Sequence, residues 1–113
     1  MKKECIFCQI ISGALSTTFI LQEEAYVVIK DIAPKAPIHY LIIPKIHIPD
    51  VTSIAPSQFD VIEALFVAAQ KVGKTLPGSQ AYKLVLNNGA EAGQRIFHLH
   101  MHLLSGPISQ YDI

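Results

Sequence analysis

Three histidines alternate with apolar residues near the end of the chain, in the run HLHMHLL at 98–104. In an extended strand, successive side chains point to opposite faces, so this pattern places the three imidazoles on one face of a sheet. Leu99, Met101 and Leu103 then lie on the other face, which predicts a core on that side. At about 3.3 Å per residue, neighbouring histidines are roughly 7 Å apart and the outer pair roughly 13 Å apart. Two of them could share a metal ion, but three on one straight strand could not easily converge.

The composition favours a small enzyme or ligand-binding protein over a nucleic-acid-binding one. The chain has 113 residues, half of them hydrophobic, which predicts a single domain over 1–113. Nine lysines and arginines balance nine aspartates and glutamates, so there is no basic footprint for a nucleic acid. Polar residues interrupt the first apolar stretch at Glu4, Gln9 and Ser12, which argues against a signal peptide or membrane span. We therefore expect a cytoplasmic protein.

The apolar pattern predicts an α+β fold with a five-stranded antiparallel sheet, one short helix and one long helix. The short helix ends at Gly13, and the long helix has Pro56 in its first turn and apolar residues at helical spacing. Two prolines make 31–37 a loop, and 87–93 is a second loop. The predicted helices cover 5–12 and 56–75, and the predicted strands cover 18–21, 25–30, 39–43, 81–86 and 94–104.

Three sequence blocks together resemble the histidine triad nucleotide-binding proteins over nearly the whole chain. The blocks are CIFCQIISG at 5–13, DIAP with APIHYLIIPK at 31–45, and the histidine run at 98–104. This resemblance implies an antiparallel sheet with two helices, paired across a two-fold axis into a homodimer. It also implies a nucleotidyl hydrolase or transferase that cleaves purine nucleoside 5′-phosphoramidates or related adenylated compounds.

The resemblance assigns catalytic roles to four histidines. His100 is the nucleophile that carries a covalent nucleotidyl intermediate, and His102 contacts the phosphate. His98 holds His100 or its surroundings in place, and His39 supports the site. Histidine suits these roles because an imidazole with an ordinary pKa near 6.5 is largely neutral at cellular pH and can attack phosphorus or relay a proton. No catalytic metal is expected.

The same resemblance, with the chemistry of each residue type, indicates a nucleotide site. The Asp31 carboxylate can accept two hydrogen bonds from the ribose diol, with Ile32 beside the sugar. Backbone N–H groups of the 87–93 loop can hold a phosphate. Arg95 departs from the family, in which a small hydroxyl residue is common, so it either clamps phosphate or points to solvent. The predicted nucleotide-binding residues are Asp31, Ile32, Asn87, Gly93, Gln94, Arg95, His100 and His102, with Ile6, Phe7 and Ile29 around the base.

Cys5 and Cys8 form a C-x-x-C pair at the start of the predicted short helix. Residues at this spacing can hold one zinc ion from one side, and His47 and His98 are the candidates that complete a tetrahedral site. A structural zinc in several bacterial relatives resembles this arrangement. A thioredoxin-like redox pair and two buried free thiols are the alternative interpretations.

Other functions remain open from the sequence. The chain could be a nucleotide-binding interaction module with little turnover, or a dinucleoside polyphosphate hydrolase that uses the same triad. A metal-dependent phosphohydrolase with the triad as ligands is disfavoured by the strand geometry. Residues 105–113 depart from the family and lack the tryptophan that crosses the dimer in some relatives.

Overall fold

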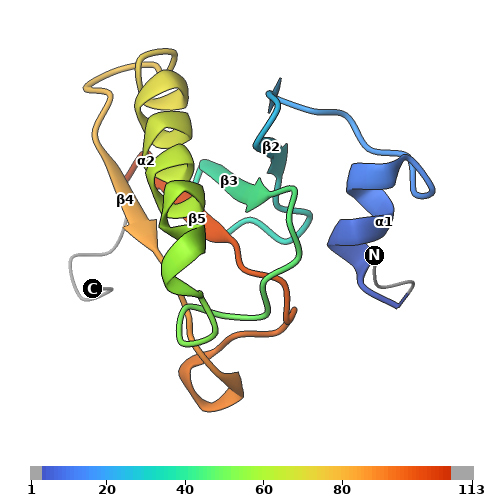
Figure 1. Ribbon diagram of the computed structural model, residues 1–113. Coiled ribbons are helices and arrows are strands. Elements are labelled where there is room, and N and C mark those ends of the chain that lie inside the picture. Colours follow the sequence, from blue (N-terminus) through green and yellow to red (C-terminus); the bar gives the residue numbers. More distant parts are fainter. Residues whose placement is uncertain (1–3, 108–113) are drawn as a thin grey trace.

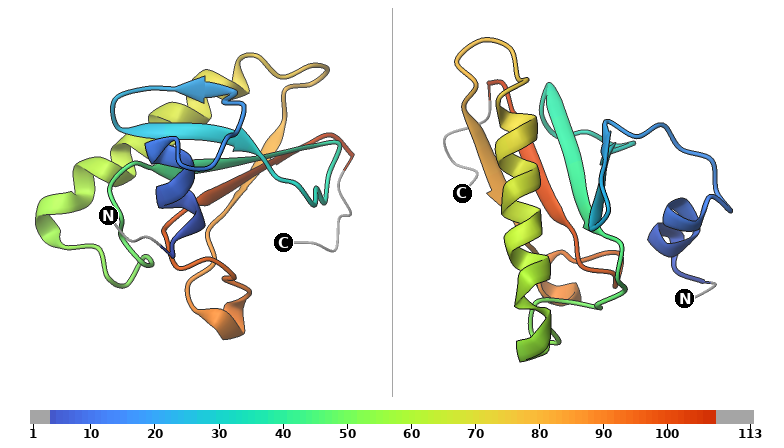
Figure 2. Two further views of the ribbon diagram at one scale, coloured as in Figure 1. Left: turned by 90° about the vertical axis from the view of Figure 1, so that its right-hand side faces the viewer. Right: turned by 45° about the horizontal axis from the view of Figure 1, so that its top comes forward.

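The computed structural model describes residues 4–107 and is built around a five-stranded antiparallel sheet with the order β1-β2-β3-β5-β4. Helix α2 packs on one face of this sheet and the short helix α1 lies on the other (Figures 1 and 2). The α+β prediction is therefore confirmed. The elements are α1 (Ile6–Ser12), β1 (Leu21–Gln22), β2 (Tyr26–Lys30), β3 (Ile38–Pro44), η1 (Pro56–Gln58), α2 (Phe59–Gly73), β4 (Tyr82–Val85), η2 (Ala90–Ala92) and β5 (Met101–Ser105).

The face of the sheet under α2 holds the main core. Leu99, Met101 and Leu103 are almost fully buried there, so the prediction that they face a core is confirmed. Helix α2 contributes its apolar side to the same cluster, because residues three and four apart share one face of a helix. The residues of α2 in this cluster are Leu65, Ala68, Ala69 and Val72.

The opposite face carries a second cluster beneath α1. Phe7 and Ile10 of α1 pack there with Val27 and Ile29 of β2 and with β3. The helix starts where the Cys5 Sγ accepts a hydrogen bond from the Cys8 backbone N–H, at 3.4 Å. It ends at Gly13, whose φ of 86° is the left-handed conformation that glycine adopts without strain.

The last strand is shorter than the sequence indicates. It begins at Met101, whereas the prediction began it at residue 94, so His102 alone of the three histidines lies within it. The segment before β5 is held by other partners, because the Leu99 N–H donates to the Ile48 carbonyl at 2.6 Å. Strand β1 has two residues and overlaps the predicted 18–21 only at Leu21, and α2 follows a separate 3₁₀ turn.

Within residues 4–107, no helix combines the length and apolar character needed to cross a membrane. The predictions that concern residues 1–3 and 108–113, including the tail without tryptophan, lie outside the described residues.

Candidate functional site

The pairing register of four strands builds the floor of a cavity on the α1 side of the sheet. One row of paired residues crosses β2, β3, β5 and β4 as Ile29, Leu41, His102 and Val85. We call it the first row. The second row runs beside it, because the Asp31 N–H donates to the His39 carbonyl at 2.9 Å and extends the pairing by one step. Its members are Asp31, His39, Leu104 and Lys83.

All eight residues of the two rows line a cavity of about 680 Å³. This volume lies within the range of roughly 300–1,000 Å³ typical of small-molecule sites. Helix α1 and the loop that ends near Arg95 form other parts of the wall. The cavity therefore has a rigid floor of sheet and a wall that combines helix and loop.

His100 lies in this cavity with one ring nitrogen fixed by the backbone. Its Nδ1 is 2.8 Å from the His98 carbonyl oxygen, and because a carbonyl only accepts, this nitrogen carries the proton. The neutral ring then has an unprotonated lone pair at Nε2. Phe7 packs edge-on against the ring, with centroids 5.1 Å apart. His100 thus presents a nucleophilic nitrogen in a defined orientation.

A second chain of hydrogen bonds assigns the tautomers of His39 and His102. The Lys35 backbone N–H donates to His39 Nδ1 at 3.1 Å, so the proton of the neutral His39 ring is on Nε2. That nitrogen lies 2.9 Å from His102 Nδ1 and donates to it. The proton of the neutral His102 ring is therefore on its Nε2. His102 is a hydrogen-bond donor in the same cavity in which His100 offers a lone pair.

Burial keeps these imidazoles neutral. It lowers the pKa of His100 and of His39, since the charged form loses solvation. The pKa of His102 is lowered to about 4 by burial first, and then by the neighbouring His100 and His39. At pH 7 the His100 ring is consequently neutral, with its proton on Nδ1 and its lone pair on Nε2.

Asp31 lies close to the hydrogen-bonded pair of His39 and His102, with its Oδ2 3.4 Å from His39 Nε2. Its Oδ1 accepts the Ala33 N–H at 2.8 Å, which fixes the carboxylate at the edge of the cavity. Asp31, His39 and His102 are near enough to share a metal ion. The tautomer of His39 opposes this arrangement, because the nitrogen that would bind the metal carries the proton.

Most of the predicted nucleotide-binding residues line the cavity. Asn87, Gly93 and Arg95 lie along it, and Ile32 lies at its rim, fully exposed. Gln94 is an exception, since it is buried outside the lining and its side chain bonds the backbone of Gly89, Pro49 and Ile96. The apolar part of the lining includes the three residues predicted around a base, Ile6, Phe7 and Ile29.

Three lysines in the lining were not identified from the sequence, namely Lys30, Lys35 and Lys83. Lys83 reaches the cavity because it pairs with Leu104, beside the pair of Val85 and His102. Alternation along 81–86 puts Lys83 and Val85 on one face, but only the pairing register places that face over the histidines. Lys35 contributes through its backbone N–H, which no side-chain pattern signals.

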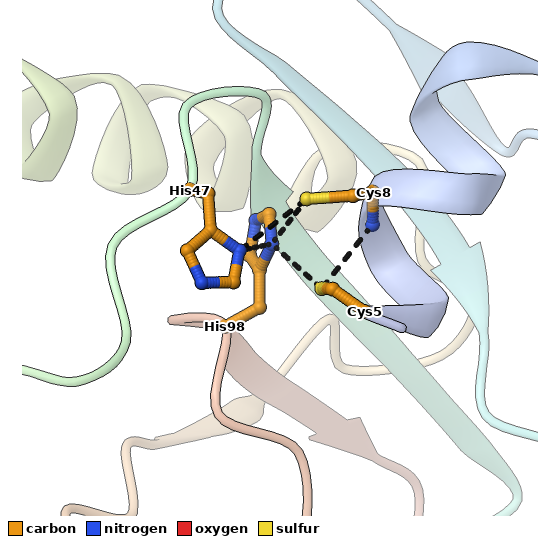
Figure 3. A group of neighbouring side chains, drawn as sticks. All are labelled: Cys5, Cys8, His47 and His98. Atoms are coloured by element: carbon orange, nitrogen blue, oxygen red, sulfur yellow. Dashed lines mark hydrogen bonds between the residues drawn. The ribbon is translucent and has the colours of Figure 1, made fainter. Parts of the chain in front are cut away.

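Cys5, Cys8, His47 and His98 form a separate cluster beside the cavity (Figure 3). The Nδ1 of His98 lies 3.4 Å from Cys5 Sγ, 3.6 Å from Cys8 Sγ and 3.1 Å from His47 Nδ1. A tetrahedral ion with zinc–nitrogen bonds of about 2.0 Å and zinc–sulfur bonds of about 2.3 Å separates such donors by roughly 3.3–3.6 Å. The donor set and its spacing therefore fit zinc.

The surroundings of His98 also fit a metal ligand. Its Nε2 is 2.8 Å from the Pro44 carbonyl and donates to it, which leaves the lone pair on Nδ1, toward the cysteines. This second hydrogen bond is typical of histidines that bind metal. Burial lowers the pKa of His98 to about 4, so the ring is neutral at pH 7. The His98 side chain thus belongs to the cysteine cluster, whereas its carbonyl orients His100.

Comparisons with known proteins agree with this geometry. The family model described as "Scavenger mRNA decapping enzyme C-term binding" matches residues 4–111. The purine nucleoside phosphoramidase of Escherichia coli is 33% identical over 107 residues, which cover 94% of this chain and 90% of that protein. A HIT family hydrolase from Clostridium thermocellum superposes with a TM-score of 0.90 at 42% identity, covering 95% of this chain and 94% of that one.

A zinc-bound histidine triad protein from Mycobacterium smegmatis is a further solved relative. It has a TM-score of 0.80 and 29% identity, and the match covers 96% of this chain and 78% of that one. The match of the family model to nearly the whole chain agrees with the two relatives of at least 30% identity. The chain therefore belongs to the histidine triad (HIT) family, and its relatives include hydrolases.

Proposed function

We propose that this protein hydrolyses purine nucleoside 5′-phosphoramidates, or related adenylated compounds, through a covalent intermediate on His100. The observation that carries the proposal is the pair of assigned tautomers in one cavity: a lone pair on His100 Nε2 and a proton on His102 Nε2. One nitrogen can attack phosphorus while the other stabilises a phosphoryl oxygen. The phosphoramidase relative supports this reaction class.

In the first step the lone pair of His100 Nε2 attacks phosphorus and forms a phosphorus–nitrogen bond. The bond from phosphorus to the leaving nitrogen breaks, and the leaving group departs with the electron pair and takes up a proton from solvent. The ring becomes cationic, and its Nδ1–H is stabilised by the His98 carbonyl. Water then cleaves the His100–phosphorus bond, which releases the nucleotide and a proton. His102 stabilises negative charge on the phosphoryl oxygens in both steps.

The rest of the cavity supports recognition of a nucleoside monophosphate. Apolar side chains of α1 and β2 offer a surface for a base at one end. Asp31 lies at the edge of the same end and can accept hydrogen bonds from a ribose diol. Gly93 and Asn87 line the wall near the phosphoryl position, with the Asn87 side chain bonded to the Ala92 carbonyl at 2.8 Å.

We further propose that Cys5, Cys8, His47 and His98 hold a structural zinc ion. The ion would join α1 to the loops that precede β5 and follow β3, and so support the backbone that orients His100. The spacing of the four donors and the second hydrogen bond of His98 support this assignment. A zinc ion held there would supply a fixed link between these segments and would take no part in the steps above.

A homodimer is the oligomeric state that we propose. Strand β4 ends the order of the described sheet, and an unpaired strand edge favours pairing with a second copy. Phe59 and Phe66 of α2 are 58% and 49% exposed, which provides apolar area for an interface. Light scattering on the purified protein distinguishes a dimer from a monomer.

The test is the steady-state hydrolysis of adenosine 5′-phosphoramidate by the wild type and by His100→Ala. Loss of the nucleophile is expected to lower kcat at least several hundredfold and up to about a millionfold. Mass spectrometry of quenched wild-type reactions should detect one adenylyl group on the peptide that contains His100. A parallel sample with chelator should keep turnover within a few-fold as long as the protein stays folded.

Each failure has a distinct meaning. A folded wild type that binds adenosine monophosphate without turnover overturns the hydrolase and favours a binding module. Full loss of activity with chelator, in protein that remains folded, shows a catalytic metal. Faster cleavage of a dinucleoside polyphosphate than of any phosphoramidate assigns the phosphoric anhydride bond as the natural target.

A further inference from the structure

The histidines of the cavity supply no positive charge for an anionic substrate. A phosphoryl ester carries negative charge at pH 7, and enzymes that transfer phosphoryl groups work mainly by positioning and by stabilising that charge. Burial lowers the pKa of His100 and, together with the neighbouring histidines, lowers that of His102 to about 4, so both rings are neutral. Asp31, the one carboxylate among the described lining residues, adds a negative charge beside them. A cation near the phosphoryl position is therefore needed to offset both negative charges.

Lys35 lies beside the hydrogen-bonded pair of His39 and His102. Its backbone N–H is 3.1 Å from His39 Nδ1, and His39 Nε2 is 2.9 Å from His102 Nδ1. Two hydrogen bonds and the width of one imidazole ring thus separate the Lys35 backbone from His102. The four methylene groups of a lysine span a comparable distance. Because Lys35 lines the cavity, its ammonium group can reach a phosphoryl oxygen that is bound at His102.

The electrostatics of the two rings agree with this position. Burial is the main cause that lowers the pKa of His39, and the positive charge of Lys35 lowers it further against the opposing charge of Asp31. The pKa of His102 is lowered by burial and the neighbouring histidines, and Lys35 again adds to the effect. Of the four cations in the lining, Lys35 is the one whose charge acts on both rings. The others are Lys30, Lys83 and Arg95.

The Lys35 ammonium group is available to a bound anion. Within residues 4–107, Lys35 forms no ion pair, and its side chain is exposed. The carboxylate of Asp31, on the same loop, has other partners. Its Oδ1 accepts the Ala33 N–H at 2.8 Å, and its Oδ2 lies 3.4 Å from His39 Nε2.

The loop that carries Lys35 is fixed at its base and along its length. The Asp31 N–H donates to the His39 carbonyl at 2.9 Å, which closes the loop. Two prolines restrict its backbone, and Pro37 packs so closely against Gly106 that a Cβ there would lie 2.7 Å from the proline ring. A fixed backbone lowers the conformational entropy that is lost when the lysine binds an anion.

We propose that the Lys35 ammonium group binds a phosphoryl oxygen of the substrate beside His102 and selects nucleoside 5′-phosphoryl compounds over uncharged nucleosides. This inference rests on the proposed function for the placement of phosphorus, but binding tests it without turnover. Side-chain variants of Lys35 keep its backbone N–H, so they leave the tautomers of His39 and His102 in place.

The experiment compares the affinity for adenosine 5′-monophosphate with that for adenosine, both measured by calorimetry. Lys35→Gln should bind the monophosphate about five- to tenfold more weakly, because it loses a charge-assisted hydrogen bond whose strength solvent reduces. Its affinity for adenosine should stay within about twofold, since the nucleoside has no group for the ammonium. Lys35→Arg keeps the charge and should recover most of the loss. Lys74→Gln removes one positive charge outside the cavity and is the matched control, with wild-type affinities.

Three further measurements connect the binding result to the reaction. Lys35→Gln should lower kcat/KM for adenosine 5′-phosphoramidate about tenfold. The preference of the wild type for the monophosphate should decline between about 0.02 M and 0.5 M salt, and that of Lys35→Gln should change less. Nitrogen NMR should find the same His102 tautomer in Lys35→Gln and the wild type. A changed tautomer would assign the loss to the histidine pair and overturn the contact.

The outcomes separate this contact from the hydrolase activity. Equal affinities of Lys35→Gln and the wild type for the monophosphate overturn the contact, even if hydrolysis that depends on His100 is found. A parallel loss for adenosine, or a similar loss in Lys30→Gln, also overturns it, because the effect then comes from the general structure or charge of the lining. A selective loss of monophosphate affinity in protein without any turnover supports the contact and removes the proposed hydrolase activity.

Discussion

At the scale of single residues, backbone hydrogen bonds determine what each histidine offers. The Lys35 N–H sets the proton of His39, which sets the proton of His102, and the His98 carbonyl sets that of His100. Imidazole tautomers differ little in free energy in water, so a fixed partner is enough to select one. The two backbone partners therefore leave a proton on one ring and a lone pair on the other, as the proposed donor and nucleophile require.

The chain of tautomers predicts the effect of removing His39. His39→Ala deletes the donor to His102 Nδ1, so His102 can carry its proton on the wrong nitrogen, and kcat should fall roughly tenfold to hundredfold. His39→Gln keeps an N–H donor on a side chain of similar reach and should recover part of this loss. Nitrogen NMR of labelled histidine reads the tautomer of His102 directly. An unchanged His102 tautomer in His39→Ala would contradict the proposed relay.

At the scale of elements, β5 and the segment before it serve two purposes on opposite sides. Met101 and Leu103 belong to the α2 core, whereas His100 and His102 line the cavity. The core side holds the strand in place, and the cavity side carries the histidines of the proposed active site. Substitutions on the two sides should consequently change different properties.

Met101→Ala is the test of the core side. Met101 is 1% exposed, and such a truncation typically costs about 2–5 kcal/mol in the free energy of unfolding. Met101→Leu conserves volume and should cost less than about 1.5 kcal/mol. Urea denaturation gives both values. Affinity for adenosine monophosphate at a temperature where both variants are folded should stay within a few-fold of the wild type, and a large loss would contradict the division into two sides.

The same elements show what could be predicted from the sequence. The period of two at 98–102 predicted the apolar core side, and Gly13 predicted the end of α1, because both signals are local. The four donors of the cysteine cluster were also predicted together and lie together. The start of β5 and the position of Lys83 depend on pairing with distant strands. No local sequence pattern predicts that pairing. For the same reason, the hydrogen bonds from the Gln94 side chain to the backbone of other loops were not predicted.

At the scale of the whole molecule, the main core and the proposed active site lie on opposite faces of one sheet. Helix α2 covers the larger core, and α1 covers the cavity side (Figure 2). The cavity side contains several buried neutral histidines. Lowering the pH should therefore destabilise the cavity side before it affects the apolar core.

The stability of the protein should therefore fall between pH 6.5 and about 4. The pKa of His102 is about 4 in the folded protein and near 6.5 in an unfolded chain, mainly because burial disfavours the charged ring. In this window the unfolded state binds the additional proton, so the contribution of His102 is complete above pH 6.5 and is lost as the pH falls toward 4. The slope is at most about 1.4 kcal/mol per pH unit. Urea unfolding at pH 7 and pH 5 should show a smaller drop for His102→Gln than for the wild type, and equal drops would contradict the assignment.

Metal removal tests how helix α1 is joined to the sheet. Cys5 and Cys8 lie at the start of α1, whereas His47 and His98 lie in loops attached to the sheet (Figure 3). The proposed zinc ion would therefore link the helix to the sheet. Apparent zinc binding is worth on the order of 10 kcal/mol in small zinc-dependent peptides, and even a third of that should lower Tm by more than about 10 °C here.

Elemental analysis of the purified protein should find about one zinc per chain, and chelator should lower Tm by this amount. Cys8→Ser, which removes one ligand, should already have the lower Tm and respond little to chelator. Turnover of the fraction that stays folded should fall only a few-fold, because the proposed zinc would support the backbone at His98 and would not contact the substrate. A chelated wild type with unchanged Tm would contradict the structural zinc, and the four side chains would then be a buried thiol and imidazole cluster that holds α1 by packing alone.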